Sequence, residues 1–170
     1  MGTLNVDEIK TGGGGTGVQI SGHVVQVVHV QDGEVASGTA TCNYDDSIMQ
    51  NTEGTEFMTL AITPTSATNK LFINVLGHFN ASTTNKIMTV GLFQDSTADA
   101  LAMQTSTESI SNSPLPIPLN HFMTAGTTSS TTFKVRAAGN SGTFTLNGYS
   151  GGRKLGGVAS SSITIMEIAQ

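Results

Sequence analysis

One run of ten residues, KLFINVLGHF at positions 70–79, constrains the fold of this chain more than any other stretch. Side chains alternate between the two faces of a β-strand. In an extended run, one face would carry Leu71, Ile73, Val75 and Phe79, and the other Phe72, Asn74, Leu76 and His78. Both faces hold apolar groups, which predicts a strand in a β-sandwich that is covered by the core on one side and by a neighbouring subunit on the other.

The rest of the sequence indicates more strands and no long helices. Charged residues make up 11% of the chain, against roughly 25% in typical soluble domains. Stretches rich in Lys, Arg and Glu, from which amphipathic helices are built, are absent. Short runs rich in Thr, Val, Ile and Phe lie between turn residues. Together with 70–79 they predict about nine strands, the others at residues 23–30, 38–42, 57–62, 87–93, 117–123, 131–137, 142–146 and 162–168.

This even spacing of short strands is typical of an antiparallel β-sandwich or jelly roll. Pro64 ends the strand at 57–62, because proline has no amide hydrogen for a ladder. The proline-marked stretch 112–118 is a place to switch sheets, and 148–157 is a long polar loop. At 170 residues we expect one jelly-roll domain over 22–170, preceded by an arm over 1–21.

The predicted arm combines strand-like flanks with a glycine hinge. The flanks alternate apolar and polar residues, and the hinge is a run of four glycines. The residues concerned are Leu4, Val6, Ile9, Gly12, Gly13, Gly14, Gly15, Val18 and Ile20. Glycine loses more backbone freedom on ordering than any other residue. We therefore expect the arm to anchor the protein by adding a strand to a partner's sheet edge, with docking on its own subunit as the alternative.

Several partner classes are disfavoured by the sequence. The glycine run lacks the Lys-Ser/Thr of a phosphate loop, and a strand-like segment follows it. With seven Lys and Arg and a net charge of −5, no basic face for nucleic acid is visible. No apolar run is long enough to span a bilayer. Met1 leads into polar and acidic residues, so we expect no secretory signal.

Metal and cofactor sites are also not indicated. His23 and His29 fall on the same face of one predicted strand, but roughly 20 Å apart, too far to share an ion within one chain. Each of the four histidines could still meet its copies on a threefold axis. Asp45 and Asp46, with Asn43 nearby, resemble calcium ligands but fit a solvated turn better. Cys42 is the sole cysteine and is expected to be a small, partly buried residue.

The sequence predicts no enzyme. Ser-x-x-Lys does not occur, and the Gly-x-Ser-x-Gly spacing at residues 148–152 falls in a polar loop before a strand, not in the strand-to-helix turn that a nucleophile elbow needs. The acid pairs Glu53 with Glu56 and Asp95 with Asp99 fall in loops and show no sign of the cleft that a glycosidase needs. With no tryptophan and two tyrosines, a sugar-stacking surface is weakly supported. The sequon at Asn80 is interpreted as chance.

Two motifs resemble small virion proteins and fibre C-termini of tailed bacteriophages. They are "LAITPTSATNKLFINVLGHF" and the ending "GGVASSSITIMEIA". In that group a Thr-Pro-x-Ser-Ala-Thr-Asn-Lys turn, here Thr63 to Lys70, links two strands, and a strand like Ser161 to Glu167 closes the chain. The opening 28 residues also resemble the N-termini of these proteins. The resemblance implies a homotrimeric knob similar to the C1q and tumour-necrosis-factor fold, with no catalytic residue or cofactor.

The expected function is therefore a non-enzymatic structural protein on the surface of a phage particle. In one version a trimeric knob docks through its arm on other capsid or tail proteins and touches a glycan or protein of the host surface. In a second version it is a capsid decoration protein that stabilises the head, and a third is a free lectin-like module. For host contact we expect three loops, represented by Thr83, Asn85, Ser96, Asp99, Tyr149, Arg153 and Lys154.

Overall fold

The computed structural model describes residues 21–108 and 113–170. Across these residues the chain forms twelve β-strands and one short 3-10 helix, η1. In chain order they are β1 (Val24–Asp32), β2 (Ala36–Gly38), β3 (Thr55–Ile62), β4 (Lys70–Ala81), β5 (Lys86–Gln94), β6 (Ala102–Glu108), β7 (Leu115–Thr124), β8 (Thr131–Gly139), β9 (Phe144–Leu146), β10 (Gly148–Tyr149), β11 (Gly152–Arg153), η1 (Leu155–Gly157) and β12 (Ser161–Ile168).

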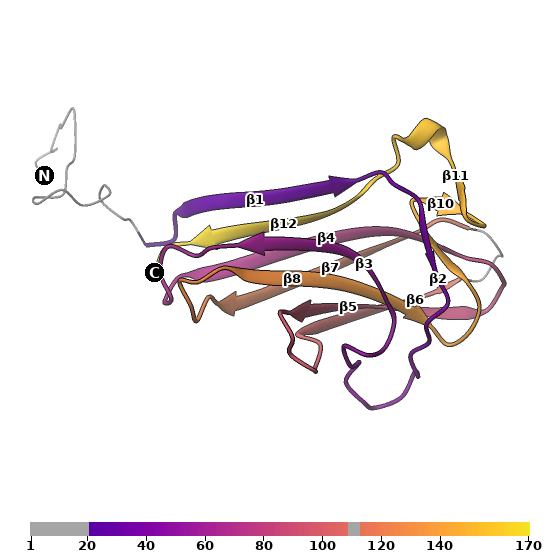
Figure 1. Cartoon of the computed structure of the whole chain (residues 1–170), viewed down its shortest axis with the longest axis horizontal. Helices are drawn as coiled ribbons and strands as arrows, with labels where there is room; N and C mark the ends of the chain where they lie inside the picture. Colours follow the sequence, from indigo (N-terminus) through magenta and orange to yellow (C-terminus); the bar gives the residue numbers. More distant parts are fainter. Residues whose placement is uncertain (1–20, 109–112) are drawn as a thin grey trace, which may run out of the picture.

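The long strands form two antiparallel sheets that face each other (Figure 1). In the first sheet β1, β12, β4 and β7 lie side by side, and short β9 continues the line of β12 along β4, with β2 outside it. The second sheet has the order β3-β8-β5-β6. Edge strand β1 contacts β3, and β6 contacts β7, so the two sheets meet along both sides. The predicted all-β jelly roll is confirmed.

The core lies between the sheets, and β4 shows why. Leu71, Ile73, Val75 and Phe79 on its inward face are each 1% exposed or less, as the alternation of the sequence predicted. They pack on inward side chains of the second sheet such as Phe133. The outward side chains of β4 from Phe72 to His78 are only half-buried within one chain.

Most predicted strands are present, with three differences. The strand expected at 38–42 is wrong: β2 ends at Gly38, and Thr41 makes only an isolated bridge to Gly139. The strand expected at 142–146 begins at Phe144. Strand β6 was not predicted, because its sequence AMQTSTE is polar and lies on the edge of the second sheet.

The loops differ in part from expectation. Within the polar loop 148–157 the structure adds the small β10–β11 hairpin and η1. The chain does switch sheets between β6 and β7. However, Pro116 and Pro118 stand inside β7, opposite His78 and Leu76. An edge strand tolerates proline because its outer side has no ladder to supply.

A β-bulge near the start of β1 corrects the prediction for two histidines. Val24 pairs with Ile168 and Val27 with Met166, with a register shift between them. Ile168 and Met166 are two residues apart on β12, so Val24 and Val27 share a face although they are three residues apart. The extra residue inverts the alternation, and His23 therefore does not share the face of His29.

The two motifs behind the phage resemblance form one structural unit. Glu167 of β12 is fully buried, and its carboxylate accepts hydrogen bonds from the turn that precedes β4. The donors are Thr65 N (2.8 Å), Thr65 Oγ1 (2.8 Å), Ser66 N (3.3 Å) and Asn69 Nδ2 (2.7 Å). Gln26 Nε2 of β1 also donates, at 2.6 Å. The closing strand thus fixes the Thr-Pro turn.

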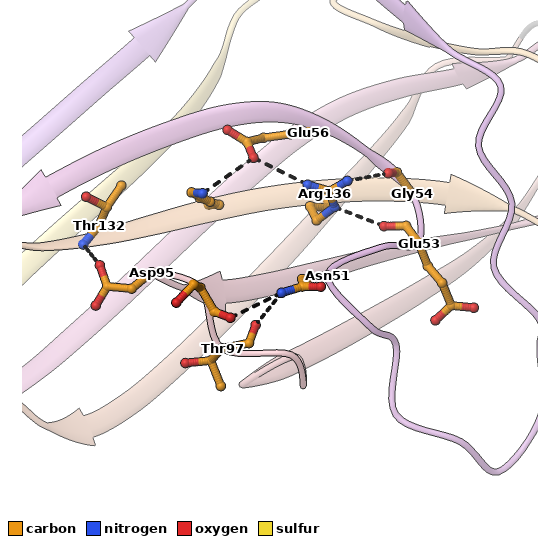
Figure 2. A network of polar contacts seen from close by, with 10 residues as sticks. Asn51, Glu53, Gly54, Glu56, Asp95, Thr97, Thr132 and Arg136 are labelled. Carbon is orange, nitrogen blue, oxygen red and sulfur yellow. Dashed lines mark hydrogen bonds and ion pairs between the residues drawn. The ribbon is translucent and has the colours of Figure 1, made fainter.

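The outer face of the second sheet is covered by the chain's own polar and apolar groups. Arg136 of β8 donates to the carbonyls of Glu53 (2.9 Å) and Gly54 (2.8 Å) and to the carboxylate of Glu56 (3.3 Å), as Figure 2 shows. These contacts fasten the segment before β3 to the sheet.

A second apolar cluster lies beside this network, where Cys42 and Met49 pack with Phe93 and Ala138. Cys42 is 6% exposed, as expected for a small buried residue, and burial raises the pKa of its thiol. Segment 39–53 therefore covers much of this sheet's outer face.

The predicted arm lies outside the described residues, from Met1 to Ile20. The residues named for it were Leu4, Val6, Ile9, Gly12, Gly13, Gly14, Gly15, Val18 and Ile20. Its point of attachment is described: Gly22 N donates to Ala169 O at 2.8 Å, and Ala169 N donates to His23 O at 3.0 Å. The arm therefore joins the sandwich beside the end of β12.

Candidate binding face and pocket

The outward face of the first sheet carries a row of apolar side chains that crosses all four long strands. Register places Val27 of β1 opposite Met166 of β12, Met166 opposite Phe72 of β4, and Phe72 opposite Phe122 of β7. Val27 is 52% exposed and Phe122 56%. We call these four residues the apolar row.

The neighbouring row along the strands is polar. His29 lies opposite Thr164, Thr164 opposite Asn74, and Asn74 opposite Asn120. His29 Nδ1 is 2.8 Å from Thr164 Oγ1, and Asn74 Nδ2 donates to Asn120 Oδ1 at 2.5 Å. Strongly charged side chains are missing from both rows, so this face resembles a surface that is covered rather than one that meets water.

A pocket of about 740 Å³ lies further along the same face, at the end of β4. Its floor includes Leu76, His78 and Asn80 of β4, and its rim comes from Tyr149 and the following segment 154–160. Phe72 and Leu76, the lining residue of β4 nearest to it, are four residues apart, so the apolar row and the edge of the pocket are separated by roughly 13 Å. The two features are therefore distinct.

Hydrogen bonds hold the base of the pocket rim in place. Asn147 Nδ2 donates to the carbonyls of Asp32 (2.7 Å) and Glu34 (3.0 Å). Ser161 Oγ donates to Asn147 Oδ1 at 2.7 Å and accepts from His78 N at 2.9 Å. These contacts join β4, β12 and the residues after β1 around the start of the β10–β11 hairpin.

The rim itself holds an unusual backbone conformation. Asn147, Ser150 and Leu155 have φ angles of 53°, 47° and 50°, in the left-handed region that L-residues rarely adopt. Such strain persists only where surrounding contacts impose it, and it clusters at functional sites. Leu155 and Val158 are 75% and 84% exposed.

Asn80 is the one described residue with buried side-chain polar atoms that have no partner. It is 1% exposed, and both Nδ2 and Oδ1 lack a hydrogen bond. Its position in β4 puts it on the same face as His78, and it lines the pocket. Since the residue is buried in a strand, the sequon at Asn80 is not accessible for glycosylation, which agrees with its interpretation as chance.

Lys154 supplies the pocket with a positive charge. Its ammonium lies 4.9 Å from the centre of the Tyr149 ring, which is a cation–π contact. Every other lining residue is neutral or is histidine: Gln31, Leu76, His78, Phe79, Asn80, Pro114, Asn147, Gly148, Tyr149, Leu155, Val158, Ala159, Ser160 and Ser162. An anion is therefore favoured here.

The predicted contact loops lie at the two opposite ends of the sandwich. Thr83 and Asn85 follow β4, and Tyr149, Arg153 and Lys154 belong to the segment that borders the pocket at the same end. Arg153 Nη2 donates to Gly156 O.

Ser96 and Asp99 follow β5, at the far end of that strand. There Gln50 Nε2 donates to Asp99 Oδ1 at 2.9 Å, and Asn51 Nδ2 donates to Ser96 O at 3.2 Å. The structure thus brings the loop of Thr83 and Asn85 and the loop of Tyr149 to Lys154 to one end. It leaves the loop of Ser96 and Asp99 at the other end.

The acids considered at the sequence level have local partners. Asp45 Oδ1 accepts from Ser47 N at 2.9 Å and from the Ser47 hydroxyl, and these bonds lower the pKa of Asp45. Asp95 accepts from Thr131 Oγ1 and Thr132 N, each at 2.8 Å. Glu53 accepts from Gln50 N at 2.8 Å.

The described ranges, 21–108 and 113–170, contain neither a cluster of metal ligands nor a helix that could span a membrane. No group of three His, Cys, Asp or Glu side chains there is arranged to hold a metal ion. No helix in those ranges is long and apolar enough to cross a membrane.

No family profile matches the chain, and no curated protein shows significant similarity. Among solved structures, the C-terminal domain of EclA, described as a sugar-binding protein, is 15% identical with a TM-score of 0.37 and covers 79% of this chain and 81% of its own. The VP2 subviral particle of infectious bursal disease virus is 12% identical, with a TM-score of 0.38 and 97% of this chain covered.

Particles of the same virus with T=1 symmetry give 13% identity, a TM-score of 0.42 and 97% coverage of this chain. The match spans 43% and 41% of the two viral chains. At these identities and TM-scores the likenesses concern architecture and carry no information about function.

No motif in the sequence indicates the pocket. Asn80 and Lys154 are far apart along the chain, and only the pairing of β9 with β4 brings the β10–β11 hairpin beside the end of β4. The sequence does predict the polar loop 148–157 as a contact segment. It does not indicate that residues of β4 form the floor of a pocket beneath this loop.

Proposed function

We propose that this chain is a non-enzymatic structural protein of a bacteriophage particle, a homotrimeric β-knob that docks through residues 1–21 and presents its opposite end to the host surface. One observation carries the proposal. The arm joins the sandwich beside Ala169, whereas the pocket, with Gln31 on its lining, lies at the other end of β1. In Figure 1 the start of β1 and the end of β12 lie at one end of the sandwich, and the β10–β11 hairpin lies at the other.

The apolar row supports assembly of the knob from copies of this chain. The outer face of the second sheet is covered by segment 39–53 and by the Arg136 contacts, while the first sheet leaves Val27 and Phe122 more than half exposed. A threefold arrangement that brings three first sheets together would bury the row on every subunit. The resemblance to trimeric phage knobs implies the same arrangement.

The host-facing role is favoured over a purely stabilising decoration role by the strained, pocketed end. A protein that only reinforces a shell has no need of a rim built from left-handed residues around a cavity. Loops at the end far from the anchor are where recognition residues are expected.

The anchoring role is tested by deleting residues 1–21 and measuring incorporation into particles. We expect the truncated protein to keep the thermal unfolding midpoint of its β body and to be absent from purified particles. Normal incorporation of the truncated protein would contradict the anchor.

Attachment is tested separately. Purified full-length protein should bind host cells, and particles that lack it should lose infectivity. Particles that keep full infectivity and lose only mechanical or thermal resistance would establish the decoration role instead.

A further inference from the structure

The pocket at the end of β4 has an unmet hydrogen-bonding requirement at its floor. A buried amide without partners is destabilising, and native proteins rarely keep one. Asn80 has an unpaired donor, Nδ2, and an unpaired acceptor, Oδ1, and both are buried, so a ligand group reaches them only after the atoms that cover them move aside. A ligand group that offers an acceptor and a donor side by side, as a secondary amide does, would satisfy both atoms.

The charge of the pocket adds a second requirement. Among the described residues that line it, Lys154 is the one full positive charge and none is Asp or Glu, although the whole chain has a net charge of −5. Charge-assisted hydrogen bonds between ammonium and carboxylate are stronger than neutral ones. The ammonium of Lys154 would therefore attract a carboxylate into the pocket, whereas the net negative charge of the rest of the chain repels carboxylates.

The walls add a third requirement. Leu76, Leu155 and Val158 are apolar, and the ring of Tyr149 stands at the rim. Such walls suit the apolar face of a sugar ring and a small methyl group. A volume of about 740 Å³ accommodates one or two rings of that kind.

From these observations we propose that the pocket binds a small acidic sugar that carries both an N-acetyl group and a carboxylate. The N-acetyl amide pairs with Asn80, the carboxylate with Lys154, and the ring packs on Leu155 and Val158. The choice of a sugar over other carboxylates rests on the proposed host-attachment function; the amide and carboxylate requirements come from the pocket alone.

Four sugars built on the same glucose ring separate these contributions. Glucose has neither group, glucuronic acid has a carboxylate at C6, N-acetylglucosamine has the acetamido group at C2, and N-acetylmuramic acid has that acetamido group and a carboxylate on the lactyl ether at O3. Titration calorimetry on the full-length protein should give the tightest binding for N-acetylmuramic acid. Each group should improve affinity about tenfold over the sugar that lacks it. Equal affinity for all four sugars, or none for any, would overturn the proposal.

Two variants assign the groups to residues. Asn80→Leu should weaken N-acetylmuramic acid about tenfold and leave glucuronic acid unchanged. Lys154→Gln should weaken both carboxylated sugars, glucuronic acid and N-acetylmuramic acid, about tenfold and leave N-acetylglucosamine unchanged. Lys134→Gln, on the outer face of the second sheet, is the matched control and should change nothing.

Asn80→Leu also has a stability readout. Because leucine removes a buried amide without a partner and has a similar shape, the unfolding midpoint of the ligand-free protein should rise. A fall would show that Asn80 has a structural partner such as an ordered water, and would contradict its role in the pocket.

A second copy of the chain is the competing occupant. Loss of oligomer mass in Leu155→Ser/Val158→Ser, together with no binding of any sugar, would show that the pocket is an intersubunit contact and would overturn the proposal. Incorporation of Lys154→Gln protein into particles separates the two proposals. If it incorporates normally, failure of sugar binding leaves the structural role intact.

Discussion

At the scale of single residues, Glu167 is the clearest case of a side chain that the fold depends on. Its carboxylate is fully buried and serves five hydrogen-bond donors on the turn before β4 and on β1. Desolvation acts to raise the pKa of Glu167, but the hydrogen bonds from Gln26, Asn69 and Thr65 prevail, and its pKa is lowered. The ionised form therefore belongs to the folded state.

Replacement of Glu167 should show this dependence directly. Glu167→Ala leaves the N–H groups of Thr65, Ser66 and Asn69, of which Asn69 is buried, without their acceptor and should lower the free energy of unfolding by about 3 kcal/mol. Glu167→Gln keeps one carbonyl oxygen for these donors and should cost about 1 kcal/mol. Urea unfolding at one fixed protein concentration measures both. An alanine variant as stable as the wild type would contradict the structural role of the carboxylate.

The pKa shifts of two groups predict how stability depends on pH. Burial lowers the pKa of His121 below its usual 6.5, so the folded state binds fewer protons than the unfolded state once pH falls below that value. Stability should therefore fall as the pH drops through the window just below 6.5. Glu167 has a pKa below its usual 4.5, so its contribution is complete above 4.5 and is lost as the pH falls from there through the folded-state pKa.

The measurement is a series of urea unfolding curves from pH 7.5 to pH 3.5. The wild type should lose stability in both windows. In His121→Leu the loss of stability just below pH 6.5 should disappear, while the loss below pH 4.5 remains. In Glu167→Gln the loss of stability below pH 4.5 should become smaller. A stability unchanged from pH 7 to pH 5 would contradict the assignment to His121.

Residue-scale features were the hardest to predict from sequence. The motif Thr63 to Lys70 does not indicate which residue accepts hydrogen bonds from its backbone and side chains. The acceptor, Glu167, lies about a hundred residues later in the chain. The orphan amide of Asn80 was equally invisible, since an Asn-x-Ser sequence gives no sign of burial. Both properties arise from strand pairings, β12 with β4 and β9 with β4, that local sequence does not encode.

At the scale of elements, β8 bends close to β9 at a glycine. A Cβ atom placed on Gly139 would come within 1.6 Å of the Phe144 ring, and Phe144 is 1% exposed. Only a residue without a side chain fits this approach. The glycine is thus a packing requirement for the connection from the second sheet to the first.

Gly139→Ala should therefore destabilise the sandwich by about 2 kcal/mol through overpacking. Adding Phe144→Leu makes room for the new methyl group, so the double variant should lose less stability than the sum of the two single variants. Thermal unfolding of the four proteins completes the cycle. Strict additivity would show that the predicted overlap is relieved in some other way.

Element prediction succeeded where one side of a strand is buried. The alternation of Leu71, Ile73 and Val75 fixed the inward face of β4, and the structure confirms it. It failed for β6, an exposed edge of polar residues, and at the start of β1. There a one-residue bulge between Val24 and Gln26 reversed the faces, and no residue type in the Val-Val-Gln sequence signals a bulge.

At the scale of the whole molecule, one face of the sandwich is left for other chains. The apolar row spans the first sheet from Val27 to Phe122, while the second sheet is covered by its own segment 39–53. The jelly-roll class was predictable from even strand spacing. The homotrimer remains a prediction, because a sequence marks apolar strand faces without showing which ones the same chain covers.

A single exposed aromatic on this face allows a matched test. Phe122→Ser should shift the protein from trimer to monomer while its unfolding curve at low concentration stays that of a folded domain, because Phe122 lies outside the core. Tyr44→Ser removes an aromatic of similar exposure, 67% against 56%, from a loop on another part of the surface. It should leave the mass unchanged, and if both variants dissociate the effect is not specific to the apolar row.

We propose that copies of this chain bury the apolar row on the outer face of the first sheet and leave the pocket at the end of β4 open. The most direct measurement is the mass of the purified full-length protein by light scattering during size-exclusion chromatography. For the wild-type protein we expect a mass about three times the chain mass of 17.5 kDa. For Phe122→Ser we expect the mass of one chain. A wild-type protein that elutes as a single 17.5 kDa chain at every concentration would contradict it.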